Sequence, residues 1–173
     1  MPTNAKTKSK RAADRKTKRS SATEPGSAIA LLKEDHREVE DYFEEYEDLE
    51  DDDAKAELAE KICAALKVHT QIEEEVFYPQ ARAATGDNDL LDEALVEHAG
   101  AKHLIAEIEA MEVGDDLYDA KIRVLGEQVK HHVKEEEEEL FPEIERSKMN
   151  LASVGAKLAE RKAELMAEVA PAE

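Results

Sequence analysis

The chain has no tryptophan and a single cysteine, and aromatic residues make up only 4% of its 173 residues. One cysteine, Cys63, excludes an intrachain disulfide and any metal cluster held by several thiolates. So few large aromatic side chains argue against a β-sandwich or a barrel. The abundance of Ala, Glu, Leu and Lys is instead typical of helices, so we expect an all-α protein.

Long apolar runs are also absent from the sequence. No stretch approaches the roughly 20 apolar residues of a membrane helix, and the N-terminus lacks the apolar core of a signal peptide. The 41% hydrophobic content is nevertheless enough to form the core of one domain. We therefore expect a cytoplasmic protein without a membrane partner.

Acidic residues dominate the chain, but they are unevenly distributed. The net charge is -19, of which residues 1–27 contribute +6 and residues 28–173 contribute -25. An acidic surface repels DNA and anionic membranes. Residues 1–27 contain almost nothing apolar and are predicted to be a disordered basic tail. Nucleic-acid contact through this tail, or tethering of a partner, is the less favoured alternative.

Apolar residues recur at intervals of three and four along the rest of the chain, which is the spacing of helices packed in a bundle. We predict helices over about 28–50, 54–83, 89–113 and 116–147, joined by short turns rich in Asp and Gly. Short turns favour an up-down-up-down four-helix bundle over residues 28–147. Residues 148–173 are predicted to add a C-terminal helix, over about 151–169, that packs on the bundle.

A motif is repeated in the second and fourth of these helices. His69 is followed by Glu73 and then Pro79, and the same spacing recurs in His132, Glu136 and Pro142. Residues i and i+4 lie on the same face of a helix. Two such helices facing each other would direct two His and two Glu toward one interior point, as in the two-metal sites of helix bundles. The repeat also implies pseudo-twofold symmetry.

Four of the six histidines fall within the apolar series, one on each predicted helix. One such histidine would be read as a core imidazole with a hydrogen-bond partner, but four together with two buried carboxylates favour a metal site. A buried, unpaired carboxylate costs several kcal/mol, and bound metal removes that cost. The ligands exceed the four of a zinc ion and suit two ions of iron or manganese type with shared carboxylates. The predicted ligands are His36, His69, Glu73, His98, His132 and Glu136.

Three further residues remain as alternative ligands or as residues that support the ligands. His131 precedes His132 and could replace it or support it from outside the ligand set. Tyr46 and Tyr118 also lie in the apolar series, where packing with a hydroxyl partner is the default interpretation and contact with the metal is the alternative.

The complete set resembles the hemerythrin-like (HHE cation-binding) domain over about residues 28–147. The resemblance rests on the order and spacing of His36, of both His-xxx-Glu motifs with their Phe77-Tyr78-Pro79 and Leu140-Phe141-Pro142 endings, and of Glu97-His98. The segment 151–169 is similar to the extra helix of many bacterial members. The resemblance implies a non-haem site of two Fe ions with an oxo or hydroxo bridge, the four histidines as terminal ligands, and Glu73 and Glu136 as bridges.

Two positions depart from the oxygen-carrying members of that family. Lys102 stands where those members have a fifth His, and it either donates a hydrogen bond to the site or extends to solvent. Their fourth-helix carboxylate also lies one residue further from its His, which points to Glu137 or to the pair His131 and Glu136. The pattern is closer to four-His relatives that sense iron or oxygen, or that react with peroxide or nitric oxide.

We therefore predict a di-iron protein that binds, senses or reacts with O2, peroxide or nitric oxide. An enzyme that decomposes hydrogen peroxide or reduces nitric oxide at the same site is the alternative. A structural helical or metal-storage protein is the second alternative. The sequence assigns no catalytic residue, redox partner or oligomeric state.

Overall fold

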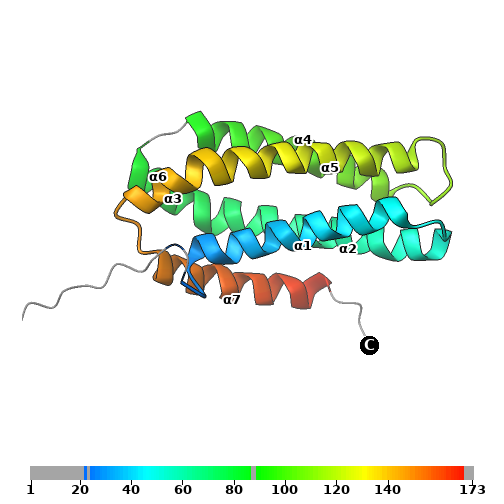
Figure 1. The fold of residues 1–173 in the computed structure, drawn as a ribbon. Coiled ribbons are helices and arrows are strands. Elements are labelled where there is room, and N and C mark those ends of the chain that lie inside the picture. The colour runs from blue at the N-terminus through cyan, green and yellow to red at the C-terminus, as the bar shows by residue number, and fades with distance from the viewer. Residues whose placement is uncertain (1–21, 23, 87–88, 170–173) are drawn as a thin grey trace, which may run out of the picture.

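The computed structural model describes residues 22, 24–86 and 89–169, and no strand occurs in these ranges. Seven α-helices follow one another (Figure 1): α1 (Ala28–Asp48), α2 (Asp52–Ile72), α3 (Tyr78–Thr85), α4 (Asp89–Glu109), α5 (Tyr118–Glu135), α6 (Phe141–Arg146) and α7 (Leu151–Val169). Two π-helical turns, η1 (Glu73–Phe77) and η2 (Glu136–Leu140), join α2 to α3 and α5 to α6. The predicted tail falls almost entirely on residues 1–21 and 23, which lie outside the described residues.

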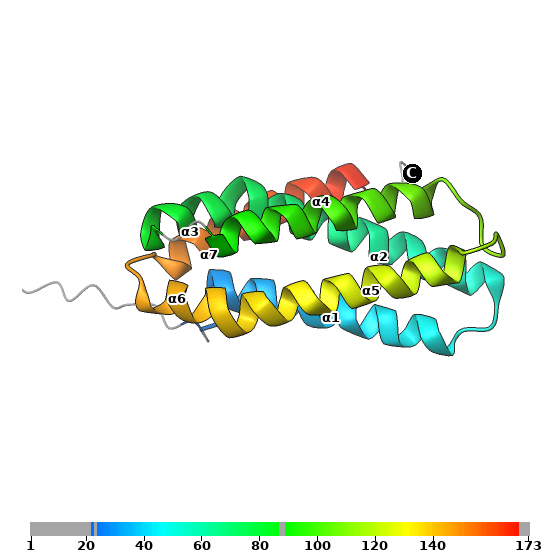
Figure 2. The same cartoon turned by 90° about the horizontal axis from the view of Figure 1, so that it is seen from above.

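The four long helical segments are α1, α2–η1–α3, α4 and α5–η2–α6, and they alternate in direction (Figures 1 and 2). The first begins where the Ser27 hydroxyl accepts a hydrogen bond from the backbone N–H of Ala30. The second begins where the Asp51 carboxylate accepts from Ala54. Such caps satisfy N–H groups that have no partner within the helix. The predicted all-α, up-down-up-down bundle with an additional C-terminal helix is confirmed.

The hydrophobic core is divided into two clusters along the bundle. Leu32 belongs to the cluster at the α3, α6 and α7 end, whereas Val39 belongs to the cluster at the opposite end. His36 lies between these two residues on α1. Phe77 and Phe141 are fully buried in the first cluster, and burial of each stabilises the fold by about 1.5–3 kcal/mol. A layer of polar side chains therefore separates two apolar regions.

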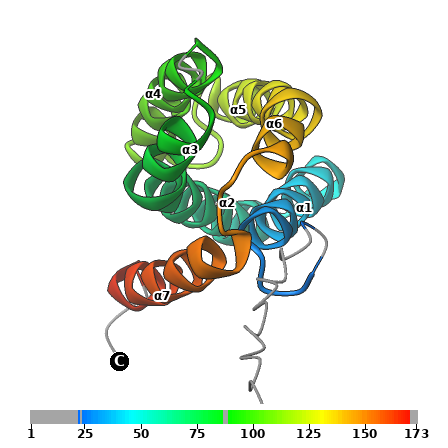
Figure 3. The ribbon, with the colours of Figure 1, turned by 90° about the vertical axis from the view of Figure 1, so that its left-hand side faces the viewer.

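Helix α7 packs on the outside of the bundle against α1 and α2 (Figure 3). It buries an apolar stripe that includes Leu151, Val154, Leu158 and Leu165. The other side of the bundle, formed by α4 and α5, has no such covering helix among the described residues (Figure 3). None of the helices in the described part of the chain combines the length and the apolarity needed to cross a bilayer.

Candidate metal centre

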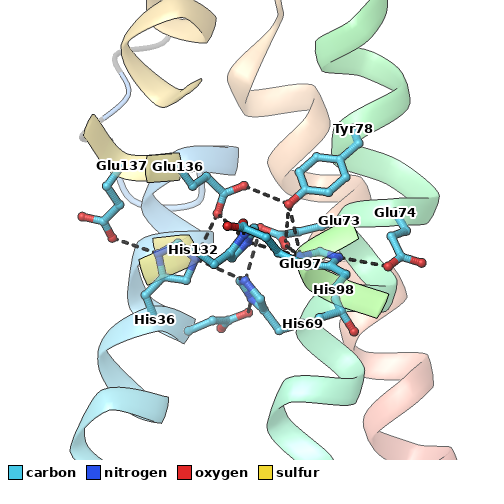
Figure 4. A network of polar contacts seen from close by, with 12 residues as sticks. His36, His69, Glu73, Glu74, Tyr78, Glu97, His98, His132, Glu136 and Glu137 are labelled. Atoms are coloured by element: carbon cyan, nitrogen blue, oxygen red, sulfur yellow. Dashed lines mark hydrogen bonds and ion pairs between the residues drawn. The ribbon is translucent and has the colours of Figure 1, made fainter. Parts of the chain in front are cut away.

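The six predicted ligand residues gather in the polar layer at the middle of the bundle (Figure 4). None of the six is more than 8% exposed. The four imidazoles come from α1, α2, α4 and α5, while the two carboxylates come from the first residues of η1 and η2. These residues are His36, His69, His98, His132, Glu73 and Glu136.

The donor atoms form two adjacent groups, and Glu73 belongs to both. One group is His36, His69, Glu73 and Glu136, and the other is Glu73, His98 and His132; within each group the ligand atoms lie within 4.8 Å of one another. Glu73 Oε1 lies 3.2 Å from His69 Nε2, and its Oε2 lies 3.2 Å from His98 Nε2. A carboxylate in this position can span two metal ions.

Glu136 lies between the same pairs of imidazoles, although less symmetrically. Its Oε2 atom is 3.2 Å from His36 Nε2 and 3.9 Å from His132 Nε2. Together the two glutamates place one carboxylate from each half of the chain between the histidine pairs.

Every one of the four imidazoles has a second carboxylate partner on its outer nitrogen. The Nδ1 atoms of His36 and His98 lie 2.8 and 2.9 Å from Glu137 and Glu74, respectively. Those of His69 and His132 lie 3.2 and 2.6 Å from Asp35 and Glu97. Each Nδ1–H donates to a carboxylate, so each Nε2 faces the interior, where it can bind a metal ion once any proton on it has been lost. Metal-binding histidines are typically oriented in this way.

The interior atoms do not satisfy one another by hydrogen bonds alone. The Nε2 atoms of His36 and His69 are 3.2 Å apart, as are those of His98 and His132. Two lone pairs at this distance repel unless a proton or a cation lies between them. Within the described residues, buried Glu73 Oε1 and Glu136 Oε2 also form no hydrogen bond, although each lies 3.2 Å from an imidazole Nε2 atom. The converging nitrogen and oxygen donors therefore fit metal ions.

The charges of the buried histidines and glutamates also indicate a metal site. Burial disfavours the charged form of His69, but the attraction of Glu73 and the hydrogen bond to Asp35 outweigh it and raise the pKa of His69 to about 10. Burial also raises the pKa of Glu73, but the attraction of His69 outweighs it and holds that pKa well below its usual range. Without metal, protons on imidazole supply the positive charge that the buried carboxylates need. Metal binding would replace those protons.

The π-helical turns determine where each motif directs its side chains. The backbone N–H of Tyr78 donates to Glu73 O, and that of Phe141 donates to Glu136 O, so each turn contains an additional residue. Pro79 and Pro142 follow immediately and cannot donate a backbone hydrogen bond. Such wide turns occur frequently at functional sites. The glutamates thus lie at the point where the regular α-helix ends.

Tyr78 is a buried residue of this layer that was not among the predicted ligands or their alternatives. Its hydroxyl oxygen lies 3.2 Å from Glu73 Oε2, 3.3 Å from Glu136 Oε1 and 3.2 Å from His98 Nε2 (Figure 4). Burial, followed by the charges of Glu136 and Glu73, raises the pKa of Tyr78 well above its ordinary value. The hydroxyl therefore keeps its proton and donates it in a hydrogen bond to a carboxylate.

A difference between the two motif copies could have drawn attention to Tyr78. The equivalent residue of the second copy is Phe141, whose ring stacks on His36 at a centroid distance of 6.0 Å. Tyr78 stacks on His98 at 5.4 Å in the same manner. The two halves of the layer thus differ by one hydroxyl group at equivalent positions.

Three of the alternative residues lie around the layer and not within it. His131 is 63% exposed and faces Glu97 and Glu135, so the structure places His132, not His131, in the interior. Lys102 is 44% exposed, and its ammonium group lies 2.7 Å from Glu74 Oε1. Glu137 contacts the outer nitrogen of His36, as described above.

The two remaining alternatives, Tyr46 and Tyr118, belong to the core cluster that contains Val39. The Tyr46 hydroxyl donates to Asp119 Oδ1 at 2.8 Å. Tyr118 is 5% exposed and packs in the same cluster. Among the described residues, neither tyrosine forms a hydrogen bond or a ring contact with the buried His and Glu layer.

A small cavity of about 30 Å³ adjoins the imidazoles. All four histidines of the layer line it, together with apolar side chains that include Val39, Leu66, Val129 and Val133. A cavity of this size holds about one water molecule. It therefore offers space for a diatomic or similarly small ligand beside the donor atoms.

Comparisons with known proteins identify a matching family and a similar fold. The family model described as the hemerythrin HHE cation binding domain matches residues 27–144. A protein named DNA nickase from Nostoc sp. (strain PCC 7120) is 31% identical over 114 residues, which are 66% of this chain and 32% of that protein. This chain thus matches about a third of the length of that relative. A hemerythrin HHE cation binding domain-containing protein from Mycobacterium kansasii has a similar fold, with a TM-score of 0.70 and 21% identity over 82% of this chain and 88% of that one.

Proposed function

The chain belongs to the hemerythrin HHE cation-binding family, and on that premise we propose that its buried layer binds two non-haem iron ions. The observation that supports this proposal best is that Glu73 belongs to two groups of metal-ligating residues, one with His36 and His69 and the other with His98 and His132. His36 and His69 would hold one ion, and His98 and His132 the other. Glu73 and Glu136 would bridge them.

The donor set supports iron over a single structural zinc ion. A structural zinc site takes four ligands in a closed tetrahedron. Four imidazoles and two shared carboxylates exceed that number, yet they leave coordination positions free on a pair of ions that each accept up to six ligands. Imidazole and carboxylate together suit iron.

We propose that the substrate is a small oxidant, namely O2, peroxide or nitric oxide. The cavity beside the histidines is about 30 Å³, and the layer around it is buried, so larger organic molecules are excluded. A bound iron pair would supply the electrons for reduction of such an oxidant. The outer carboxylates keep the imidazoles oriented, and the apolar lining of the cavity excludes bulk water.

An enzyme that consumes peroxide or nitric oxide is the second candidate, and Tyr78 favours it. Reduction of either molecule requires protons, and the Tyr78 hydroxyl is a buried group that retains its proton within hydrogen-bond distance of both bridging carboxylates. A protein that only binds or senses the ligand does not need this group. We do not propose DNA cleavage, because the Nostoc relative named a nickase is matched over only 32% of its length and residues 28–173 carry a charge of -25.

The test is metal analysis of the full chain after anaerobic reconstitution with ferrous iron, followed by the optical spectrum in air. We expect about two irons per chain, and a loss of iron in Glu73→Gln and Glu136→Gln. Glu138→Gln is the matched control, because Glu138 is an exposed member of the same acidic run. No bound iron, or equal iron in all four proteins, would overturn the proposal.

Peroxide and nitric oxide turnover then separate the two candidates. Turnover well above that of the same amount of free iron, reduced in Tyr78→Phe with iron content unchanged, would identify an enzyme. Bound iron with reversible ligand binding and no turnover would identify a binding or sensing protein.

A further inference from the structure

A second group of metal-ligating side chains lies at the surface, outside the buried layer. His131 and Glu135 are one turn apart on α5, and Glu97 faces them from α4. His131 Nε2 is 3.2 Å from Glu135 Oε1 and 3.5 Å from Glu97 Oε1, and one ligand atom of each residue lies within 4.8 Å of the others. We propose that these three residues bind a divalent transition-metal ion in addition to the ions of the buried centre.

The pseudo-twofold relation between the two halves supports this assignment. In the first half, Asp35 accepts a hydrogen bond from His69 Nδ1 with one oxygen and forms an ion pair with Lys162 of α7 through the other. In the second half, Glu97 takes the place of Asp35 and accepts from His132 Nδ1 with Oε2. Within the part of the chain that the structure describes, its Oε1 meets no lysine. It faces His131 and, beyond it, Glu135.

The reason for this difference is the position of α7. The helix covers the α1–α2 side and supplies a cation to Asp35, but no described helix covers the α4–α5 side (Figure 3). A metal ion bound by His131, Glu97 and Glu135 would occupy, relative to His132, the place that the ammonium group of Lys162 occupies relative to His69.

The local charge also favours a cation. Among the described residues, neither Glu97 nor Glu135 forms an ion pair with Lys or Arg, and their only basic partners are histidines. Glu74, the outer carboxylate beside His98, is by contrast paired with Lys102. Two carboxylates beside one imidazole leave an excess of negative charge, which a divalent ion would neutralise.

The donors and their exposure indicate the type of ion. One imidazole nitrogen with two carboxylate oxygens suits Zn²⁺, Mn²⁺ or Fe²⁺, whereas Ca²⁺ requires six to eight oxygens. The side chains of Glu97 and Glu135 are 22% and 31% exposed, so an ion can enter from solvent and complete its coordination with water. Glu97 is already oriented by His132, which reduces the entropy lost on binding.

The experiment is equilibrium dialysis of the full, metal-free chain against Zn²⁺, followed by zinc and protein analysis. We expect His131→Ala and Glu135→Gln each to bind one zinc ion fewer per chain than the parent. His103→Ala is the matched control: His103 is 78% exposed and has a glutamate, Glu107, four residues later, but Glu107 is paired with Lys121. We expect its zinc content to equal that of the parent.

The same comparison in a Glu73→Gln, Glu136→Gln background isolates the surface site from the buried one. A difference of one zinc ion that persists in this background supports the surface site whether or not the buried layer binds iron. Equal zinc content in the parent, His131→Ala and Glu135→Gln proteins would overturn the proposal. Circular dichroism confirms folding, which substitution of the exposed His131 side chain should leave unchanged.

Discussion

At the scale of single residues, the hydroxyl group of Tyr78 distinguishes the two halves of the buried layer. It lies near the carboxylates of both Glu73 and Glu136, whereas the equivalent ring of Phe141 offers no polar atom there. The carboxylate oxygens that face Tyr78, which are Glu73 Oε2 and Glu136 Oε1, therefore have a neutral hydrogen-bond donor. Among the described residues, the other two oxygens have only imidazoles beside them, those of His69, His36 and His132. The two groups of donor atoms are thus chemically inequivalent.

Tyr78→Phe should destabilise the metal-free protein by about 1–3 kcal/mol, because it removes a donor from buried carboxylates that cannot reach water. Urea unfolding of the metal-free chain measures this change. Tyr42→Phe is the control, since the Tyr42 hydroxyl donates to Glu38 at the exposed surface. Its effect should be within about 0.5 kcal/mol. Similar small losses for both variants would contradict the role assigned to Tyr78.

At the scale of elements, the π-helical turns explain what the sequence could and could not predict. Helical periodicity was sufficient to place His69 with Glu73, and His132 with Glu136, because an α-helix continues up to each glutamate. On a regular α-helix, five residues advance by about 140° beyond a full turn, which would direct Tyr78 away from Glu73. The wider turn brings Tyr78 back to the same side. Apolar spacing does not reveal this additional residue.

The packing of α7 on the start of α1 provides a second test at this scale. A Cβ atom on Gly155 would lie 2.1 Å from Gly26 O and 2.8 Å from Ala28 N, so the helix would have to move. Gly155→Ala should lower the free energy of unfolding by about 1–3 kcal/mol. In a helix interior, alanine is more favourable than glycine by about 1 kcal/mol, so the expected loss is the opposite of what helix propensity alone would give.

Gly100→Ala is the matched control for that substitution. A Cβ atom there would meet only Gln128 Oε1, at 3.7 Å, which is ordinary contact. This variant should gain about 0.5–1 kcal/mol from helix propensity. Urea midpoints that move in the same direction for both variants would show that α7 does not pack as closely as described.

At the scale of the whole molecule, the buried layer connects all four long helical segments, so bound metal should stabilise the complete fold. A ligand that binds only the folded state at 100 times its Kd adds about 2.7 kcal/mol. For a chain of this length, that corresponds to an increase in Tm of about 5–10 °C. Thermal unfolding before and after chelation measures it. Glu73→Gln should respond much less, and equal Tm values with and without metal in the parent would count against the centre.

Some contacts between distant parts of the molecule could not be predicted from the sequence. The sequence indicated that residues 151–169 form an amphipathic helix, and this helix is observed as α7. Its spacing did not reveal which face of the bundle it covers, nor that Lys162 pairs with Asp35. Those contacts join residues 127 positions apart, and they depend on how the connection after α6 directs the chain. The asymmetry between Asp35 and Glu97 was therefore visible only in three dimensions.

The relation between the two halves has a consequence for the origin of such a chain. The α1–α2 and α4–α5 pairs each contribute one lone histidine, one His-xxx-Glu motif and two outer carboxylates. Neither pair completes the centre alone, but two copies of one pair would. The molecule thus has the geometry expected from duplication and fusion of an ancestral helical hairpin that once assembled as a homodimer. Tyr78 and α7 are then the features by which the two halves differ.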